Sequence, residues 1–192
     1  MYKNNQVTVS GKIRNAFTYA GEKNEKPVCT AELDIIRKHH RYPHTVTVMV
    51  PSEMVGANED YAGQMVIVTG GLRSYDTSGE AGQGLGIYIM AETITITTAQ
   101  ERQVNEVCLR GVLCRRPLTK IVSHDNLVTM FFLAVDYQGQ TAYVPCSVGD
   151  LQAMDVAAMD VGTELEISGR IHSRYSRLSV WIYQDKTSLR RI

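Results

Sequence analysis

Hydrophobic and polar residues alternate along several short segments of the chain. Val7 and Val9 alternate with Thr8 and Ser10, and residues 66–72 show the same pattern. A period of two places successive side chains on opposite faces, so each segment predicts a strand with one buried face. Segments 52–61 and 147–159 lack this alternation of β-branched residues, and we expect a short helix or an irregular cap there. The pattern predicts an all-β protein.

The pattern of strands occurs twice. Five blocks match in the same order: 5–11 with 105–111, 33–35 with 133–135, 50–52 with 144–146, 63–74 with 162–173, and 85–89 with 178–182. Matches in constant order predict two copies of one domain, at residues 1–99 and 104–192. Three strands, a short helix and two strands are the elements of the five-stranded Greek-key barrel called the OB-fold. We therefore predict two tandem OB-fold barrels, each with a short helix between strands three and four.

Glycines recur at equivalent positions inside the predicted strands. Gly11 corresponds to Gly111, and Gly70 corresponds to Gly169. Glycine weakens the interior of a strand unless it permits a sharp bend, and a small closed barrel needs such bends at its corners. The glycines therefore favour a barrel in each copy.

Composition narrows the classes of function. The chain has 192 residues, and its 20 Lys and Arg balance its 20 Asp and Glu. A neutral total argues against a protein that binds by bulk positive charge and against a polybasic membrane anchor. There is no apolar run of membrane-spanning length, and the first residues lack the apolar stretch of a secretory signal. We expect a cytoplasmic protein with no membrane partner.

Cysteines and catalytic motifs give no sign of a cofactor or a reaction. The four cysteines include no Cys-x-x-Cys pair, and no His completes a zinc pattern. We expect free thiols that pack as small hydrophobic residues, with no metal and no other cofactor. Because the motifs of hydrolases and nucleotide-dependent enzymes are absent, we also expect no enzyme activity.

Three segments of the second copy carry a family pattern. They are 105–111 (Asn-x-Val-x-Leu-x-Gly) followed by Leu113, Arg115 and Pro117, then 131–135 (Phe-x-Leu-Ala-Val), then 161–171 (Val-Gly-x-x-Leu-x-Ile-x-Gly-Arg-Ile). Together they resemble the bacterial single-stranded DNA-binding proteins. The resemblance implies sequence-tolerant, non-catalytic binding of single-stranded DNA in replication, repair or recombination. The first copy fits this pattern less well, because Glu32 and Asp34 lie in its second strand.

The chain departs from that family in two ways. Members usually carry one barrel per chain and commonly assemble four barrels as a homotetramer, so two barrels per chain imply a homodimer. Members also end in a flexible acidic tail that recruits partners, whereas residues 186–192 here are basic. We therefore expect no acidic tail for the recruitment of partners.

Charge is segregated along the second copy. Residues 102–120 carry five basic residues and one acidic residue, residues 121–166 carry seven acidic residues and no Lys or Arg, and later residues carry six basic residues and one acidic residue. The first and fourth strands of this barrel type are adjacent, so the two basic segments predict one face for phosphates. Aromatic side chains on that surface would stack bases. The candidates are Arg110, Arg115, Arg116, Phe132, Arg170, Arg174 and Trp181.

In the first copy the candidates lie near two loops. Arg37, Lys38, Arg41 and Tyr42 belong to a segment between the second and third strands. Arg73 precedes a long loop at 74–84, and Tyr75 lies within that loop. Tyr88 occupies the repeat position of Trp181, and strand parity places both rings outward. Each ring could be a base platform or part of a subunit interface.

Four interpretations of the sequence remain open besides single-stranded DNA binding. The candidate cations could be ordinary surface charges. The three histidines at 39–44 could hold a metal, although no carboxylate or thiol lies beside them. OB-folds also bind single-stranded RNA. A primosome-type or mobile-element protein could use such barrels as a scaffold for protein interactions.

Overall fold

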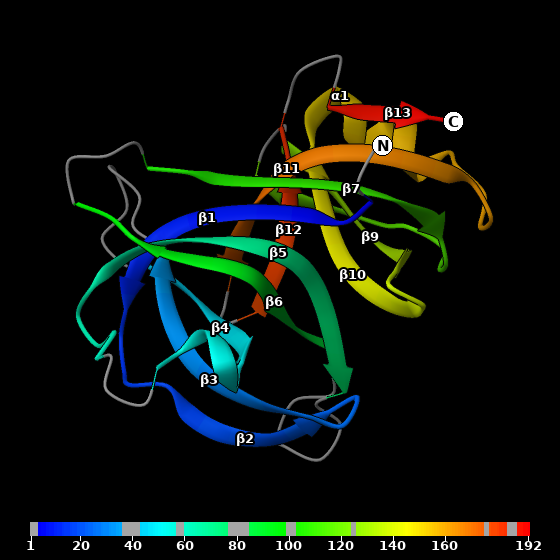
Figure 1. Ribbon diagram of the computed structural model, residues 1–192. Coiled ribbons are helices and arrows are strands. Elements are labelled where there is room, and N and C mark those ends of the chain that lie inside the picture. Colours follow the sequence, from blue (N-terminus) through cyan, green and yellow to red (C-terminus); the bar gives the residue numbers. More distant parts are fainter. Residues whose placement is uncertain are drawn as a thin grey trace.

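The computed structural model describes residues 4–35, 43–56, 60–76, 85–98, 103–123, 126–174, 177–183 and 188–192 (Figure 1). These ranges contain thirteen strands, one α-helix and one 3₁₀ turn. The prediction of an all-β protein is confirmed. No helix in the described ranges has the length and apolar character needed to cross a membrane.

Strands fill both halves of the chain. The first half contains β1 (Gln6–Ile13), β2 (Thr18–Lys23), β3 (Lys26–Ile35), β4 (His44–Pro51), β5 (Met65–Asp76) and β6 (Leu85–Ile96). The second half contains β7 (Asn105–Leu113), β8 (Leu118–Ser123), β9 (Asn126–Tyr137), β10 (Gln140–Gly149), α1 (Asp150–Ala157), β11 (Glu164–Arg174), β12 (Arg177–Ile182) and β13 (Leu189–Arg191). β1 and β7 are the predicted first strands, and each is followed after a break by a strand that the alternation did not predict, β2 or β8. In the second half Pro117, which has no backbone N–H, lies at the break.

Strand pairing closes on itself in each half. β1 pairs with β5, β5 with β6, β6 with β4, β4 with β3, and β3 with β1. The strands β7, β11, β12, β10 and β9 repeat this cycle in the second half. In both halves the pair that joins the third predicted strand to the fifth is parallel, β4 with β6 and β10 with β12. We call these two closed arrangements the first ring and the second ring.

The helix differs between the halves. It occurs in the second half as α1, between β10 and β11. At the same place in the first half the described residues contain only the 3₁₀ turn Ser52–Met54, and residues 57–59 lie outside the described ranges. Gly56 follows that turn, and glycine costs a helix about 1 kcal/mol relative to alanine. By contrast, α1 contains Leu151, Ala153 and Met154, which favour a helix.

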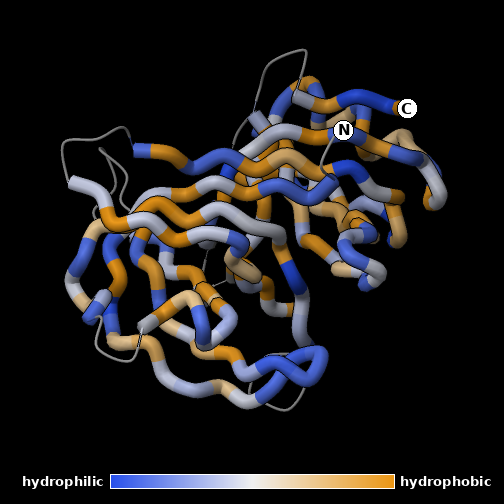
Figure 2. Tube along the Cα trace, in the orientation of Figure 1, coloured by the Kyte–Doolittle hydropathy of each residue, from blue (hydrophilic) through white to orange (hydrophobic). Residues whose placement is uncertain are grey.

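The core of each ring comes from the buried face of its strands. In the first ring Val9, Leu33, Val48, Val68 and Ile89 are fully buried, and the residues on either side of most of them are polar or more exposed. Figure 2 shows the resulting alternation of hydrophobic and hydrophilic positions along the strands. Leu109, Leu133, Val144, Leu165 and Ile182 have the same role in the second ring. Period-two patterning therefore places one face of nearly every strand in a core.

Gly11 and Gly111 permit close contact between strands. A Cβ on Gly11 would lie 2.5 Å from the carbonyl oxygen of Asp34, and a Cβ on Gly111 would lie 2.5 Å from that of Ala134. Both distances are too short for any side chain, so the first strand of each ring crosses the second strand only because these positions are glycine. The repeated glycines thus close the ring through a backbone approach.

Two of the five repeat blocks are aligned wrongly in the sequence. Val46 pairs with Leu33 in the first ring, and Val144 pairs with Leu133 in the second, so Val144 corresponds to Val46 rather than to Val50. Pro51 ends β4, whereas Pro145 lies inside β10 opposite Phe132. The two Val-Pro dipeptides are therefore not equivalent, because the strand register places them at different heights.

The predicted equivalence of Tyr88 and Trp181 is also wrong. Trp181 pairs with Arg170, whereas the equivalent Gly71 pairs with Met90. Trp181 therefore corresponds to Met90, two residues beyond Tyr88.

β1 and β7 join the two rings into one sheet. They pair antiparallel from Gln6 opposite Cys108 to Val9 opposite Asn105, and they run side by side in Figure 1. Ser10 extends the connection, because its N–H donates to the carbonyl of Val104 at 2.8 Å and its Oγ accepts from the Val104 N–H at 2.8 Å. The first strands of the two repeats thus form the centre of a sheet that crosses the molecule.

Asn5 and Asn105 extend two strand ladders with their side chains. Asn5 Nδ2 donates to the carbonyl of Leu72 at 2.8 Å, and Asn5 Oδ1 accepts from the Leu72 N–H at 2.7 Å. Asn105 makes the same pair with Ile171, at 3.0 and 2.8 Å. Both pairs continue the register of their ladders, which end in backbone pairing at Val7 and Val107. A primary amide has the donor and acceptor of a peptide group, so it completes the ladder in place of backbone.

We expect Asn5→Ala to lower the free energy of unfolding by about 2 kcal/mol, because Asn5 is 1% exposed and its loss leaves two buried backbone groups of Leu72 unpaired. Urea unfolding followed by circular dichroism measures the change. Asn4→Ala is the matched control, since Asn4 also makes two hydrogen bonds but in a solvent-exposed setting. Equal losses for the two variants would contradict the role of Asn5.

Candidate nucleic-acid interface

Reciprocal contacts flank the pairing of β1 with β7. On one side Ser74 Oγ of β5 accepts a hydrogen bond from the Tyr143 N–H of β10 at 2.9 Å. On the other side the N–H of Ser173, which is the repeat equivalent of Ser74, donates to His44 Nδ1 of β4 at 3.2 Å. The fourth strand of each ring therefore contacts the third strand of the other ring, as expected for two similar domains packed about an approximate two-fold axis.

Arg73 belongs to this junction. Its Nη1 donates to the carbonyl of Tyr137 at 2.9 Å, and its guanidinium lies 5.0 Å from the centre of the Tyr137 ring. Arg73 is 7% exposed, and this burial lowers the pKa of its guanidinium. The sequence predicts Arg73 as a phosphate contact, but the structure places it between the rings, where Tyr137 covers it.

His44 is likewise a junction residue. Its ring lies 5.0 Å from the ring of His172, which occupies the repeat position of Arg73. His44 Nδ1 accepts the hydrogen bond from Ser173, so it carries no proton. The sequence raises a metal site that includes His44, but His39 and His40 lie outside the described residues. Within the described ranges no cluster of three His, Cys, Asp or Glu side chains could hold a metal ion.

An outward surface of the second ring carries aromatic side chains on neighbouring strands. Phe132 of β9 is half-buried, and the guanidinium of Arg115 lies 5.2 Å from the centre of its ring. Tyr143 of β10 is 48% exposed, and its backbone pairs with Ala134, two residues from Phe132 on the same face. Arginine over an aromatic ring keeps its charge while its stem covers apolar surface. Flat apolar surface thus lies beside a positive charge.

Trp181 continues this surface on β12. It pairs with Ser147 of β10, so its ring lies on the same face of the strands as Tyr143 and Pro145. Its partner on the other side is Arg170 of β11, whose guanidinium lies 5.9 Å from the Tyr183 ring. Trp181 is half-buried and its ring lies 5.5 Å from that of His172. We call Phe132, Tyr143 and Trp181, together with Arg115 and Arg170, the aromatic face.

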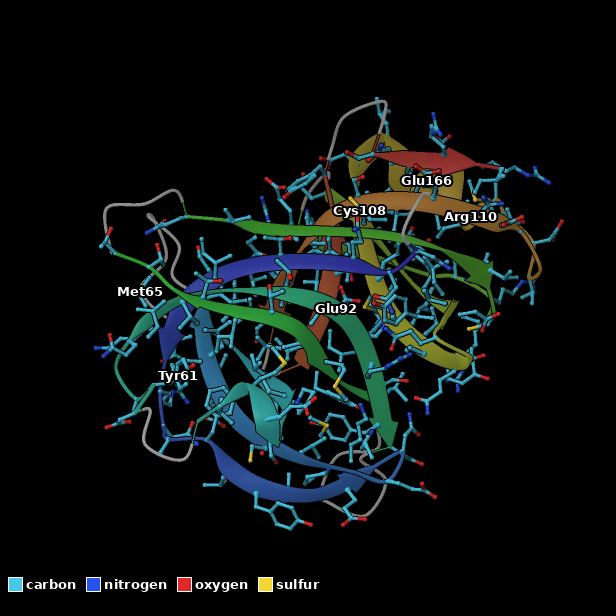
Figure 3. All side chains as sticks on the ribbon, viewed as in Figure 1. Tyr61, Met65, Glu92, Cys108, Arg110 and Glu166 are labelled. Atoms are coloured by element: carbon cyan, nitrogen blue, oxygen red, sulfur yellow. The ribbon has the colours of Figure 1, made fainter. Side chains whose placement is uncertain are left out.

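Arg110 and Arg116 complete the described cations predicted in the second copy. Arg110 is exposed on β7, and its Nε and Nη2 bond to Glu164 Oε1 at 2.8 and 2.7 Å. Figure 3 shows Arg110 near Glu166 on the neighbouring β11. Arg116 is exposed just after β7. The two basic segments do meet along β7 and β11, but Arg110 is already paired with a carboxylate.

Tyr88 and Tyr75 lie together in the first ring. Strand parity predicts Tyr88 as an outward ring, yet it is 5% exposed. Lys23 of β2 donates to its hydroxyl and lies 4.8 Å from its ring centre, and the Tyr75 ring lies 6.1 Å away. The prediction of an exposed Tyr88 is wrong because β2 covers it. Tyr75 is exposed and packs over Gly86, where a Cβ would overlap its ring.

Several predicted residues lie outside the described part of the chain. They are Arg37, Lys38, Arg41, Tyr42 and the side chain of Arg174. Two aromatic residues absent from the predicted set belong to the second half of the chain: Tyr143, a member of the aromatic face, and Tyr183, which lies beside Arg170. Tyr143 is more exposed than Phe132, and the buried Val144 beside it signals its outward direction. Tyr183 Oη donates to the Asn105 carbonyl at 2.9 Å, which no local pattern reveals.

Comparison with known proteins gives a match in structure alone. No protein-family model and no curated protein matches the sequence significantly. The wild-type single-stranded DNA-binding protein from Thermus aquaticus is similar over 100% of this chain and 94% of that chain, with a TM-score of 0.77 and 19% identity. A deletion variant of the same protein is similar over 98% and 94%, with a TM-score of 0.78 and 20% identity. The chain therefore shares its fold with that protein along nearly its full length.

Tyr183 makes the stability of the fold sensitive to alkaline pH. Burial raises the pKa of Tyr183 above 10.0, because its neutral hydroxyl is favoured. We expect the wild type to exceed Tyr183→Phe in free energy of unfolding by about 1 kcal/mol at pH 8. Since the folded state holds the proton more tightly, this difference is complete below pH 10 and is lost as the pH rises through the higher value.

Urea unfolding from pH 8 to pH 11 tests this expectation. Tyr19→Phe is the control, because Tyr19 is exposed on β2. A difference between the wild type and Tyr183→Phe that stays constant across this range would contradict the assignment.

Proposed function

We propose that the chain consists of two tandem OB-fold barrels, at residues 1–99 and 104–192, that bind single-stranded DNA without catalysing a reaction. The observation that carries this proposal is the aromatic face of the second ring. There the rings of Phe132, Tyr143 and Trp181 lie on one surface, beside the guanidinium groups of Arg115 and Arg170. The shared fold with the Thermus aquaticus protein, which is named for binding single-stranded DNA, supports the same function.

The chemistry of this surface fits a single strand better than a duplex. Unpaired bases expose flat faces, and stacking on an aromatic side chain contributes about 1–3 kcal/mol per base regardless of base identity. The two arginines supply positive charge for the phosphates that flank such bases. Binding would therefore tolerate sequence differences and weaken with salt.

The biological setting and the assembly are parts of the same proposal. A protein that coats single strands serves replication, repair or recombination, and the balanced charge of the chain suits local binding along a surface. We also propose a homodimer, because two barrels per chain supply half of the four that the family resemblance implies. Single-stranded DNA is the expected partner, and RNA is the competitor to be tested.

We expect oligo(dT) to quench the fluorescence of Trp181, the one tryptophan of the chain. We also expect the double change Arg115→Glu with Arg170→Glu to weaken the binding of oligo(dT) at least tenfold. The loss of two phosphate contacts lowers the slope of log affinity against log salt by about 1.4. Fluorescence titrations across a range of salt concentrations measure both quantities. Lys12→Glu with Arg191→Glu is the matched control, because it reverses two exposed charges on β1 and β13.

The outcomes separate the alternatives. An unchanged salt slope in the double variant would place the binding surface elsewhere. Tighter binding of oligo(U) than of oligo(dT) would favour RNA. No binding of either polymer at low salt would overturn nucleic-acid binding and leave the interaction scaffold as the function.

We expect Phe132→Leu to weaken oligo(dT) binding by about 5- to 150-fold, which corresponds to the loss of one stacked base. Leucine keeps most of the apolar volume, so the free energy of unfolding should change little. Anisotropy of a labelled oligo(dT) measures the affinity. Tyr19→Leu, at an exposed tyrosine of the first ring, is the control. If Phe132→Leu binds as tightly as the wild type, Phe132 is not a base platform.

A further inference from the structure

The two rings carry different side chains at equivalent outward positions. Phe132 of β9 corresponds to Glu32 of β3, because the buried neighbours Leu33 and Leu133 occupy the same place in the repeat. Trp181 likewise corresponds to Met90, because Trp181 pairs with Arg170 and Met90 pairs with the equivalent Gly71. The backbone cycle is therefore nearly the same in both rings, while the surface that a single strand would meet is not.

Arg14 of the first ring lies in a cluster of carboxylates. Its Nε and Nη2 donate to the two carboxylate oxygens of Asp34 at 3.1 and 2.6 Å, and its Nη1 donates to Glu32 Oε2 at 3.0 Å. Nη2 also donates to Thr45 Oγ1 at 2.7 Å. These bonds use both edges of the guanidinium fork, and the hydrogen bond with Asp34 contributes most to raising the pKa of Arg14.

The charge of this cluster opposes a phosphate. One guanidinium faces two carboxylates, so the group as a whole is negative. In the second ring the comparable cation, Arg115, lies over the uncharged Phe132 ring instead. A phosphate approaching Arg14 would have to displace a bidentate carboxylate and then remain beside a second one, which is unfavourable on electrostatic and geometric grounds.

Tyr88, the aromatic residue of β6, is also covered. Tyr88 is buried under Lys23, whose ammonium group bonds to its hydroxyl. The buried ring is then unavailable for stacking with a base. Two separate features of the first ring, the Arg14 cluster and the Tyr88 contact, therefore remove the chemistry that the aromatic face provides.

We propose that a single strand binds to the strand surface of the second ring, and that the Arg14–Glu32–Asp34 cluster excludes it from the equivalent surface of the first ring. This inference rests on the proposed function and concerns the surfaces formed by the described strands. It assigns to Glu32 and Asp34 a role in limiting where nucleic acid binds. The two repeats then divide into a binding ring and a ring that supports it through the junction.

Neutralising the two carboxylates tests the exclusion directly. In Glu32→Gln with Asp34→Asn, the side chains keep their size but Arg14 no longer faces negative charge. We expect the affinity for oligo(dT) to rise at least threefold and the salt slope to increase by about 0.7, as for one added phosphate contact. Anisotropy of a labelled oligo(dT) at 0.2 M salt measures both, and the site size on poly(dT) should increase.

Removing each arginine gives the matched comparison. Arg115→Ala should weaken binding at least fivefold, whereas Arg14→Ala should change it less than twofold, because exposed charges are screened beyond about 8–10 Å near this ionic strength. Arg14 is partly exposed, and urea unfolding verifies that the variants are folded.

Two results would overturn the inference while leaving the proposed function intact. One is an equal loss of affinity in Arg14→Ala and Arg115→Ala, and the other is unchanged or weaker binding by Glu32→Gln with Asp34→Asn. Failure of the wild type to bind any single strand would overturn the proposed function and this inference together.

Discussion

The antiparallel pairing of β1 with β7 is the interaction on which the rest of the molecule depends. It spans Gln6 to Val9 on one strand and Asn105 to Cys108 on the other, and it converts two closed rings into a single sheet. At these positions each strand has a neighbour from its own ring and another from the other ring. Each ladder within a ring then ends early, and the side chains of Asn5 and Asn105 complete it. Asparagine occurs at this position in both repeats because each ladder ends at the same place and needs one donor and one acceptor to complete it.

That pairing also fixes which residues become junction contacts. Once β1 and β7 lie side by side, the ends of β5 and β11 reach the third strand of the opposite ring. Arg73 and His172 occupy equivalent positions there, and each packs against a ring from the other half, Tyr137 and His44 respectively. An arginine at such a position contributes to the association of the rings rather than to a ligand. The approximate symmetry of the backbone thus brings equivalent positions against the opposite ring, even where the contacting side chains differ.

Strand alternation and the internal repeat predicted much of this structure, because both depend on local periodicity. They anticipated the five strands of each ring, though not β2, β8 or β13, and the burial of Leu33 and Leu133. Parity placed Phe132 and Trp181 on the outward face. The same parity failed for Tyr88, which Lys23 covers from a strand 65 residues away in the chain. Arg73, a candidate because it lies beside a loop, is covered by Tyr137 of the other ring. The two-residue alternation indicates on which face of a strand a residue lies. It does not indicate which other segment of the chain covers that face.

The net charge of the chain likewise does not indicate which charged side chains are available to a ligand. Arg14, Arg110 and Arg190 lie in ion pairs with carboxylates of neighbouring strands, and Arg73 is buried in the junction. Arg115 and Arg170 instead lie over aromatic rings, which leaves their charge uncompensated by those neighbours. The net charge counts all six arginines equally, whereas a ligand interacts with each arginine together with the side chain that neighbours it. The positive charge available at the surface of this protein is therefore set by pairing across strands, and pairing across strands is what distinguishes the two repeats.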